Sequence, residues 1–245
     1  MHNILSLGTV ELILVNCGSV NLDEEVKLLT TLFGQGLVYD EVLVKYLQPP
    51  VTGRGQGLNA GGEAASGDLV TFCHADTTLP LGWDCRVRES LSADKAEGSA
   101  FMFQMSDVSA VVGGLWVARC VDLRCRLFKL PYGDQTLSMR RRTWRWLGGY
   151  PQQCLMEDYE IVTLLRQRDM AGAGGLKILR GGEGVTAVCS NRRWAENGVE
   201  YVCRKNAEVV EVYERLGAGG CYERYYGRKW EGREGREEEI EEAIR

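Results

Sequence analysis

Three common signatures are missing from this sequence. Its nine cysteines include no C-x-x-C pair, which removes the usual zinc spacing and favours reduced, buried thiols. No apolar run approaches the roughly 18 residues that span a bilayer, and Met1–Thr9 lacks the basic start and apolar run of a signal peptide. A net charge of −5 gives no general attraction for nucleic acid. We therefore expect a cytoplasmic protein with no transmembrane segment and no nucleic-acid partner.

The composition suits one α/β domain. The chain has 245 residues, of which 44% are hydrophobic and 26% charged. Short apolar runs alternate with helix-like segments, which predicts a mostly parallel sheet with helices on both faces. The expected strands are 10–15, 41–47, 68–73, 99–105, 135–139, 176–179 and 185–189. The expected helices are 22–33, a short one ending at Ala65 after a glycine-rich loop at 53–62, 114–128, 141–147, 157–168 and 200–216.

Two carboxylate groups lie at the ends of expected elements. Asp76 follows the third strand within His74-Ala75-Asp76, and Glu157-Asp158 begin a helix. A hard cation such as Mg²⁺ takes one or two protein carboxylates and leaves its other positions to water and phosphates, a role that suits Asp76. A carboxylate facing a bound diphosphate can accept a proton from an attacking hydroxyl, which suits Asp158. Each residue would also serve as an ordinary N-cap or turn former.

Three segments carry a family resemblance. GRGQGLNAGGEAASGDLVTFCHADTTLPLGW, LPYGDQTLSMRRRTWRWLGGYPQQCLMEDYEIVTLLRQR and SNRRWAENGV occur in that order and resemble family 2 glycosyltransferases, more narrowly the arsenosugar-biosynthesis branch. The resemblance spans roughly residues 10–204. It implies a GT-A (Rossmann-like) fold whose strand-end acidic motif holds Mg²⁺ or Mn²⁺ against the diphosphate of a nucleotide sugar. We expect the domain to cover residues 1–227 and a charged C-terminal tail to cover 228–245.

The resemblance also implies roles for individual residues. Asp76 would be the metal ligand, and Asp158 the catalytic base of an inverting single displacement, with Glu157 beside it. His74 replaces the first acidic residue of the family's D-x-D pattern and would lie near the sugar or the metal, unless it is simply packed. The donor-binding candidates are Asn16, Ser19, Arg54, Asn59, His74 and Arg193, the last in a motif with Ser190 and Arg192. The acceptor-binding candidates are Asp134 and Trp194.

Plainer roles remain open for several of these residues. Asp134 fits a simple turn, Arg54 an exposed loop, and Trp194 the core. The resemblance also starts late: Asn16-Cys-Gly-Ser19 alone corresponds to the family's aspartate-glycine-glycine-serine turn, with asparagine in place of a carboxylate. We therefore expect the N-terminal strand to be missing or atypical. A parallel sheet without an inner strand leaves neighbouring backbone groups unpaired.

Three functions follow as hypotheses. The first is transfer of a hexosyl or ribosyl group from a nucleotide sugar to the hydroxyl of a small molecule. The second is a non-catalytic remnant of the fold with impaired donor binding. The third is a peripheral membrane enzyme acting on a polyprenyl phosphate, suggested by the arginine-bearing amphipathic stretch 114–129 and the cluster Arg140-Arg-Arg-Thr-Trp-Arg145. Interior packing of the apolar stripe of 114–128 is the competing explanation for that stretch.

Overall fold

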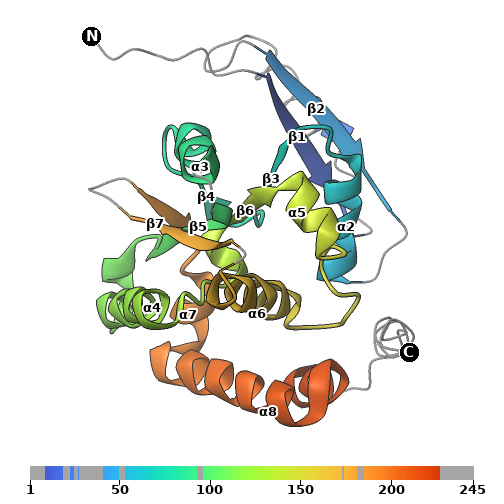
Figure 1. Cartoon of the computed structure of the whole chain (residues 1–245). Coiled ribbons are helices and arrows are strands. Elements are labelled where there is room, and N and C mark those ends of the chain that lie inside the picture. Colours follow the sequence, from blue (N-terminus) through green and yellow to red (C-terminus); the bar gives the residue numbers. More distant parts are fainter. Residues whose placement is uncertain are drawn as a thin grey trace, which may run out of the picture.

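The computed structural model describes residues 9–18, 23–24, 27, 41–49, 53–92, 96–172, 174–180 and 185–226. They form a single α/β domain in which helices flank a central sheet (Figure 1). The α/β class is thus confirmed. Most of the expected helix at 22–33, Ser19 and the tail at 228–245 lie outside the described residues.

The central sheet is mixed rather than mostly parallel. Its strands are β3 (Leu69–Phe72), β4 (Thr77–Thr78), β5 (Ala96–Met105), β6 (Leu137–Arg140), β7 (Gly175–Leu179) and β8 (Thr186–Cys189). They follow the order β3-β6-β5-β8-β4, with β7 also paired to β5. β5 runs parallel to β7 and β8, whereas β6 is antiparallel to both β3 and β5. The expectation of a mostly parallel sheet is therefore wrong for β6. The chain enters β6 from the end of the sheet at which β5 finishes, so the two strands run in opposite directions.

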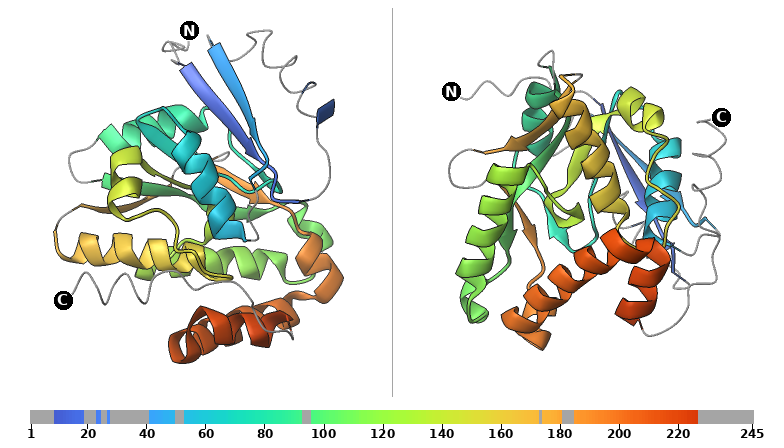
Figure 2. Two further views of the ribbon diagram at one scale, coloured as in Figure 1. Left: turned by 90° about the vertical axis from the view of Figure 1, so that its right-hand side faces the viewer. Right: turned by 60° about the horizontal axis from the view of Figure 1, so that its bottom comes forward.

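Helices cover both faces of this sheet (Figure 2). The helices of the described residues are α2 (Arg54–Ala64), α3 (Trp83–Ser92), α4 (Gly114–Phe128), α5 (Arg141–Trp146), α6 (Glu157–Met170), α7 (Arg192–Asn197) and α8 (Val199–Tyr226); α8 lies below α4 and α6 in Figure 1. Short 3₁₀ turns, η1 (Val108–Ala110) and η2 (Gly133–Gln135), precede α4 and β6. α8 bends at Gly217, where φ is 68°, next to the expected helix end at residue 216.

The core lies on the two faces of β5. Ala100 belongs to a cluster with Met139 and with Ile161 of α6, whereas Phe101, its neighbour, packs with Leu91 of α3. Alternating strand side chains point to opposite faces, so one buried strand anchors helices on both sides. The catalytic candidates are carried on the elements that this core holds in place.

The expected glycine-rich loop is in fact most of α2. Its glycines allow close packing: a Cβ on Gly57 would lie 2.4 Å from Cys17 Sγ, and one on Gly62 would lie 2.6 Å from the ring of Trp144. Glycine weakens a helix by about 1 kcal/mol relative to alanine, so local propensity favours a loop here. Close tertiary packing overrides that preference in α2.

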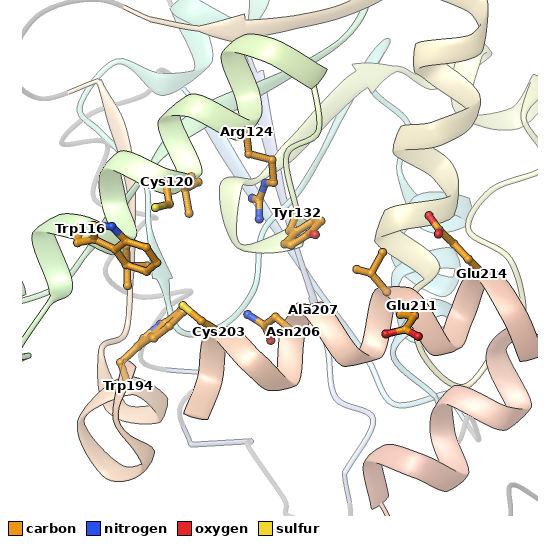
Figure 3. A pocket seen from close by; sticks show the side chains of 13 residues that line it. Trp116, Cys120, Arg124, Tyr132, Trp194, Cys203, Asn206, Ala207, Glu211 and Glu214 are labelled. Atoms are coloured by element: carbon orange, nitrogen blue, oxygen red, sulfur yellow. The ribbon is translucent and has the colours of Figure 1, made fainter. Parts of the chain in front are cut away.

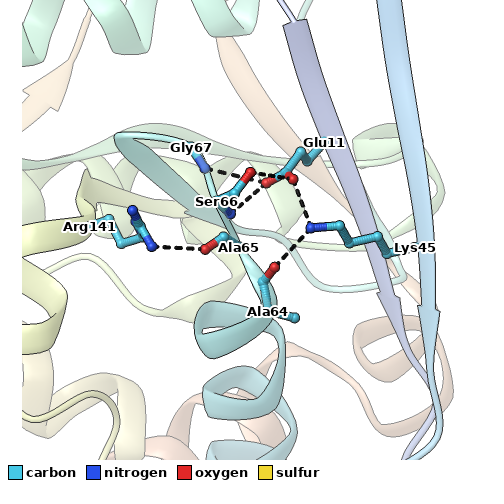
Figure 4. Close-up of polar contacts among 7 residues, drawn as sticks. All are labelled: Glu11, Lys45, Ala64, Ala65, Ser66, Gly67 and Arg141. Atoms are coloured by element: carbon cyan, nitrogen blue, oxygen red, sulfur yellow. Dashed lines mark hydrogen bonds and ion pairs between the residues drawn. The ribbon is translucent and has the colours of Figure 1, made fainter.

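The first two strands stand apart from the central sheet. β1 (Thr9–Val15) and β2 (Glu41–Leu47) pair in parallel along their whole length, and within the described residues they pair only with each other. Side chains join them to the connection between α2 and β3 (Figure 4). Glu11 accepts hydrogen bonds from Ser66 N at 2.7 Å and from Lys45 Nζ at 2.8 Å. Burial raises the pKa of Glu11, but these bonds outweigh it and lower the pKa to about 2.

The apolar stripe of α4 is only partly interior, which corrects the explanation by interior packing. Val117 and Cys125 are buried, but Trp116, Leu123, Leu127 and Phe128 are between 55% and 64% exposed. No described helix has the length and apolar character needed to cross a membrane. All nine cysteines are unpaired, and Cys17, Cys73 and Cys120 are exposed, so the expectation of buried thiols holds for only some of them.

Candidate active site

Two neighbouring carboxylates begin α6. The residue before them, Met156, adopts the left-handed conformation (φ 68°, ψ 19°) at the N-cap. For a residue other than glycine this costs on the order of 1 kcal/mol, and such strain is found preferentially at functional sites. It directs the chain so that Glu157 and Asp158 both lie in the first helical turn, where the positive end of the helix dipole favours negative charge.

Arg54 holds the buried member of the pair. The side chain of Glu157 is 1% exposed, and Arg54 Nε donates a hydrogen bond to its Oε1. Arg54 Nη2 lies 3.8 Å from Oδ1 of Asp158. Burial and the charge of Asp158 raise the pKa of Glu157, and Arg54 opposes this shift. Arg54, the first residue of α2, thus fixes the acidic start of α6. These carboxylates therefore neutralise part of the positive charge of Arg54 before any phosphate binds.

Asp158 is held from the opposite side by η2. The backbone N–H of Gly133 donates to its Oδ2 at 2.9 Å. A Cβ on Gly133 would lie 2.6 Å from Cε1 of His74 and 3.1 Å from Oδ2 of Asp158. Burial, followed by the charge of Arg54, lowers the pKa of His74, while Asp158 and Asp76 oppose the shift. A neutral imidazole therefore lies beside the proposed base at neutral pH.

Asp76 and Asp134 contribute to the same charged region. Asp76 is exposed after β3, and its carbonyl oxygen accepts from Ser190 N at 3.0 Å. Oδ1 of Asp134 is buried and has no hydrogen-bond partner. Burial raises the pKa of Asp134 to about 6; Asp158 and Asp76 add to this effect, and Arg124 opposes it. The carboxylates of β3, η2 and α6 therefore influence one another at one end of the sheet.

The donor set fits a hard cation that a substrate completes. Within the described residues, no group of three His, Cys, Asp or Glu side chains is arranged to hold a metal alone. Asp76 presents an exposed carboxylate, and the unpartnered oxygen of Asp134 shows that the region has unused acceptor capacity. Mg²⁺ and Mn²⁺ accept such a sparse set of oxygen ligands, with water and phosphate oxygens filling the remaining positions.

The two asparagine candidates make structural bonds. Asn16 is buried at the end of β1, where its Nδ2 donates to Tyr46 Oη at 2.9 Å and its Oδ1 accepts from Gly18 N at 3.0 Å. Asn59 exchanges two bonds of 2.7 Å with the backbone N–H and C=O of Tyr150. Asn59 therefore fixes the turn that leads to α6, a role that the sequence motif alone does not indicate.

Two late-motif residues, Arg193 and Trp194, lie beside α8, whereas the backbone of Ser190 bonds to that of Asp76. Arg193 is exposed and its Nη2 donates to Oδ1 of Asn206 at 3.2 Å. Trp194 lines a cavity between α4 and α8. Tyr132 lines the same cavity, and it precedes the glycine that holds Asp158.

Sequence reasoning missed two positioning groups. The backbone N–H of Gly133 and the left-handed Met156 bear directly on Asp158. The glycine in Pro131-Tyr-Gly-Asp-Gln135 was the available signal for the first, because a glycine can mark a close approach of backbone to a neighbouring group. Nothing in the local sequence marks Met156, since methionine has no preference for positive φ.

The comparisons with known proteins find likeness only among solved structures. No family model and no curated protein matches the chain. Glucosyl-3-phosphoglycerate synthase from Mycobacterium tuberculosis, in complex with Mn²⁺, UDP-glucose and phosphoglyceric acid, is 18% identical at a TM-score of 0.43, covering 91% of this chain and 81% of that one. The same enzyme with Mn²⁺, UDP and glucosyl-3-phosphoglycerate is 17% identical at a TM-score of 0.43, covering 88% and 78%.

A third structure, of a mycobacterial protein, is 17% identical at a TM-score of 0.40 and covers 74% of this chain. The chain spans 65% of that protein's length, slightly less than two thirds. At these values the likeness does not decide function, and the arguments below rest on this chain's own residues.

Proposed function

We propose that this chain is a metal-dependent, inverting glycosyltransferase of the GT-A type and of family 2. It would move a hexosyl or ribosyl group from a nucleotide sugar to a hydroxyl of a small molecule. One observation carries the proposal: Asp158 is held between Gly133 and Arg54 and lies beside His74, next to the strand end that bears Asp76. The three sequence motifs alone support the narrower arsenosugar branch, and the cytoplasm remains its proposed location.

In this proposal Asp158 takes the proton of the acceptor hydroxyl. The Gly133 N–H leaves Oδ1 of Asp158 on the side of Arg54 and orients the carboxylate. The buried pair of Glu157 and Arg54 keeps the start of α6 in place during turnover. Neutral His74 can donate or accept a hydrogen bond to the sugar without adding positive charge. Bound at Asp76, the metal would stabilise negative charge on the leaving diphosphate.

A non-catalytic remnant is the second candidate. It is favoured by the separation of β1 and β2 from the central sheet, because in this proposal the donor would lie at the ends of these strands. The side-chain bonds of Glu11 connect the two sheets without backbone pairing. Binding of the nucleotide-sugar donor therefore distinguishes the glycosyltransferase from the non-catalytic remnant.

Calorimetric titration with a panel of nucleoside diphosphates, each with Mn²⁺ and then with EDTA, is the decisive test. We expect saturable binding that requires the metal and that Asp76→Ala weakens at least tenfold. Asp158→Asn should preserve this binding yet lower transfer by about 10²–10⁴-fold, the usual contribution of a general base. Asp122→Asn is the matched control, since Asp122 pairs with Arg126 on α4. Metal-independent binding, or none by folded protein, would favour the remnant.

A further inference from the structure

A cavity of about 490 Å³ lies between α4 and α8 (Figure 3). Its volume falls within the range of roughly 300–1,000 Å³ that is typical of small-molecule sites. Three aromatic side chains line it: Trp116 from α4, Trp194 from α7 and Tyr132 from the segment before η2. Val117, Val121 and Val210 add apolar surface. The walls thus offer flat apolar faces on several sides.

Arg124 is the one cation among the lining residues that the structure describes, and its guanidinium already makes several contacts. Arg124 donates from Nε to Leu130 O at 2.9 Å and from Nη2 to Gln135 Oε1 at 3.0 Å. Its guanidinium also stacks on the ring of Tyr132, 3.6 Å from the centroid. These bonds use two of the five N–H donors of Arg124 and, with the stacking, hold the guanidinium against the Tyr132 ring.

The charged residues at the α8 side of the cavity are acidic. Glu214 accepts a hydrogen bond from Tyr159 Oη at 3.1 Å, and Glu211 lies 3.4 Å from Arg215 Nη1. Arg193 reaches Asn206 from outside the set of lining residues. The described lining residues thus carry two carboxylates and one guanidinium, so an anion gains no net electrostatic attraction from them.

Tyr132 connects the cavity to the segment that holds the proposed base. Tyr132 lines the cavity, and the next residue, Gly133, donates its N–H to Asp158. The charge of Asp158 is close enough to contribute to the raised pKa of Tyr132, after burial and Arg124. At the other wall, Tyr159 follows Asp158 on α6 and bonds to Glu214. A ligand stacked on Tyr132 would thus contact the residue next to the glycine that holds Asp158.

We propose that this cavity is the acceptor site and that it takes an uncharged hydroxyl compound with an apolar ring face rather than a phosphorylated acid. This inference rests on the proposed function, since it assigns the acceptor of that reaction. Aromatic side chains stack on the apolar faces of such rings, and Asn206 supplies an amide at the cavity wall. A phosphorylated acid would bring further negative charge to lining residues that already carry two carboxylates and one guanidinium.

Calorimetry with phenyl β-D-glucoside and with 3-phosphoglycerate tests the assignment on the full chain. We expect saturable binding of the glucoside and at least tenfold weaker binding of the acid. Ala207→Trp adds an indole from an exposed position that lines the cavity, and it should weaken glucoside binding at least tenfold. Leu123→Trp, at an exposed position of α4 outside the lining, is the matched control and should bind within twofold of the wild type.

The assignment is overturned by tighter binding of 3-phosphoglycerate than of the glucoside, or by equal glucoside affinity in wild type and Ala207→Trp. Absence of saturable glucoside binding by folded protein would do the same. Equal melting temperatures of the two tryptophan variants establish that both are folded. Nucleoside diphosphate titration in the same samples separates the two proposals. If the nucleoside diphosphate still binds with metal but the glucoside does not bind, only the acceptor assignment is removed. If the glucoside binds but the nucleoside diphosphate does not, the transferase proposal is removed.

Discussion

The backbone N–H of Gly133 holds Oδ2 of Asp158 at 2.9 Å. This bond joins the 3₁₀ turn before β6 to the first turn of α6, two segments that are 25 residues apart in the chain. A carboxylate held by a backbone donor loses rotamer freedom, so its second oxygen has a defined direction. The absence of a Cβ at Gly133 also leaves room for His74.

Gly133→Ala should therefore impair transfer more than stability. The added Cβ would meet the His74 ring at 2.6 Å and force the ring or the turn to shift. A misplacement of about 1 Å in an active site can cost about 10² in rate. We expect a loss of that order in kcat, measured as transfer at saturating donor.

The control for this prediction is Gly67→Ala, whose Cβ would meet only Leu69 O, at an ordinary 3.5 Å. It should keep kcat within twofold. If Gly133→Ala retained full kcat with an unchanged melting temperature, the close packing of His74 and Asp158 would have no catalytic role.

Arg54→Met should make folding stability depend more strongly on pH. Without the guanidinium, the pKa of buried Glu157 rises further above its unfolded value, because Arg54 is the group that lowers it. A raised carboxyl pKa means that stability is lost as pH rises through that pKa. We expect a loss of about 1 kcal/mol at pH 7, modest because Arg54 is half-exposed, with recovery toward pH 5. Urea unfolding across that range measures it.

Arg54→Met combined with Glu157→Gln provides the control for that prediction. Removing the carboxylate should abolish the added pH dependence. A single variant whose stability changes equally at pH 5 and pH 7 would show that Arg54 acts through packing alone.

Asp134→Asn should stabilise the protein at neutral pH. In the wild type, burial raises the pKa of Asp134 from 3.8 to about 6, so ionisation costs stability as pH rises through this window. The variant should gain up to about 3 kcal/mol at pH 7 relative to the wild type, and the gain should vanish below pH 4, where both side chains are uncharged. Equal unfolding free energies at pH 7 would show that the carboxylate is well solvated.

Asn59→Ala should destabilise the fold with little effect on donor binding. It removes both hydrogen bonds to the Tyr150 backbone and leaves the N–H and the C=O of Tyr150 without their partner. We expect a loss of about 2 kcal/mol, the usual order for unsatisfied buried groups. Metal-dependent nucleoside diphosphate binding should stay within twofold at a temperature where the variant is folded. A tenfold loss of affinity would instead restore Asn59 as a donor ligand.

Local pattern was sufficient to predict most elements of the fold. The apolar run at 41–47 and the helical stretch at 114–128 match β2 and α4 in their bounds, because hydrophobic periodicity and chain punctuation are properties of neighbouring residues. The acidic pair at the start of α6 was predicted for the same reason. The start of α2 was expected too late, because its glycines suit a loop locally and a closely packed helix globally.

The sequence by itself determined most of the segments that become strands and helices, although not α3, α7 or β4, and it indicated which chemically active side chains stand at their ends. Only the tertiary structure decided that β6 runs antiparallel to β5, that Arg54 pairs with Glu157, and that Gly133 holds Asp158. These relationships join residues far apart in the chain. They depend on how the buried faces of distant elements pack, a property that the spacing of residues along one segment does not contain.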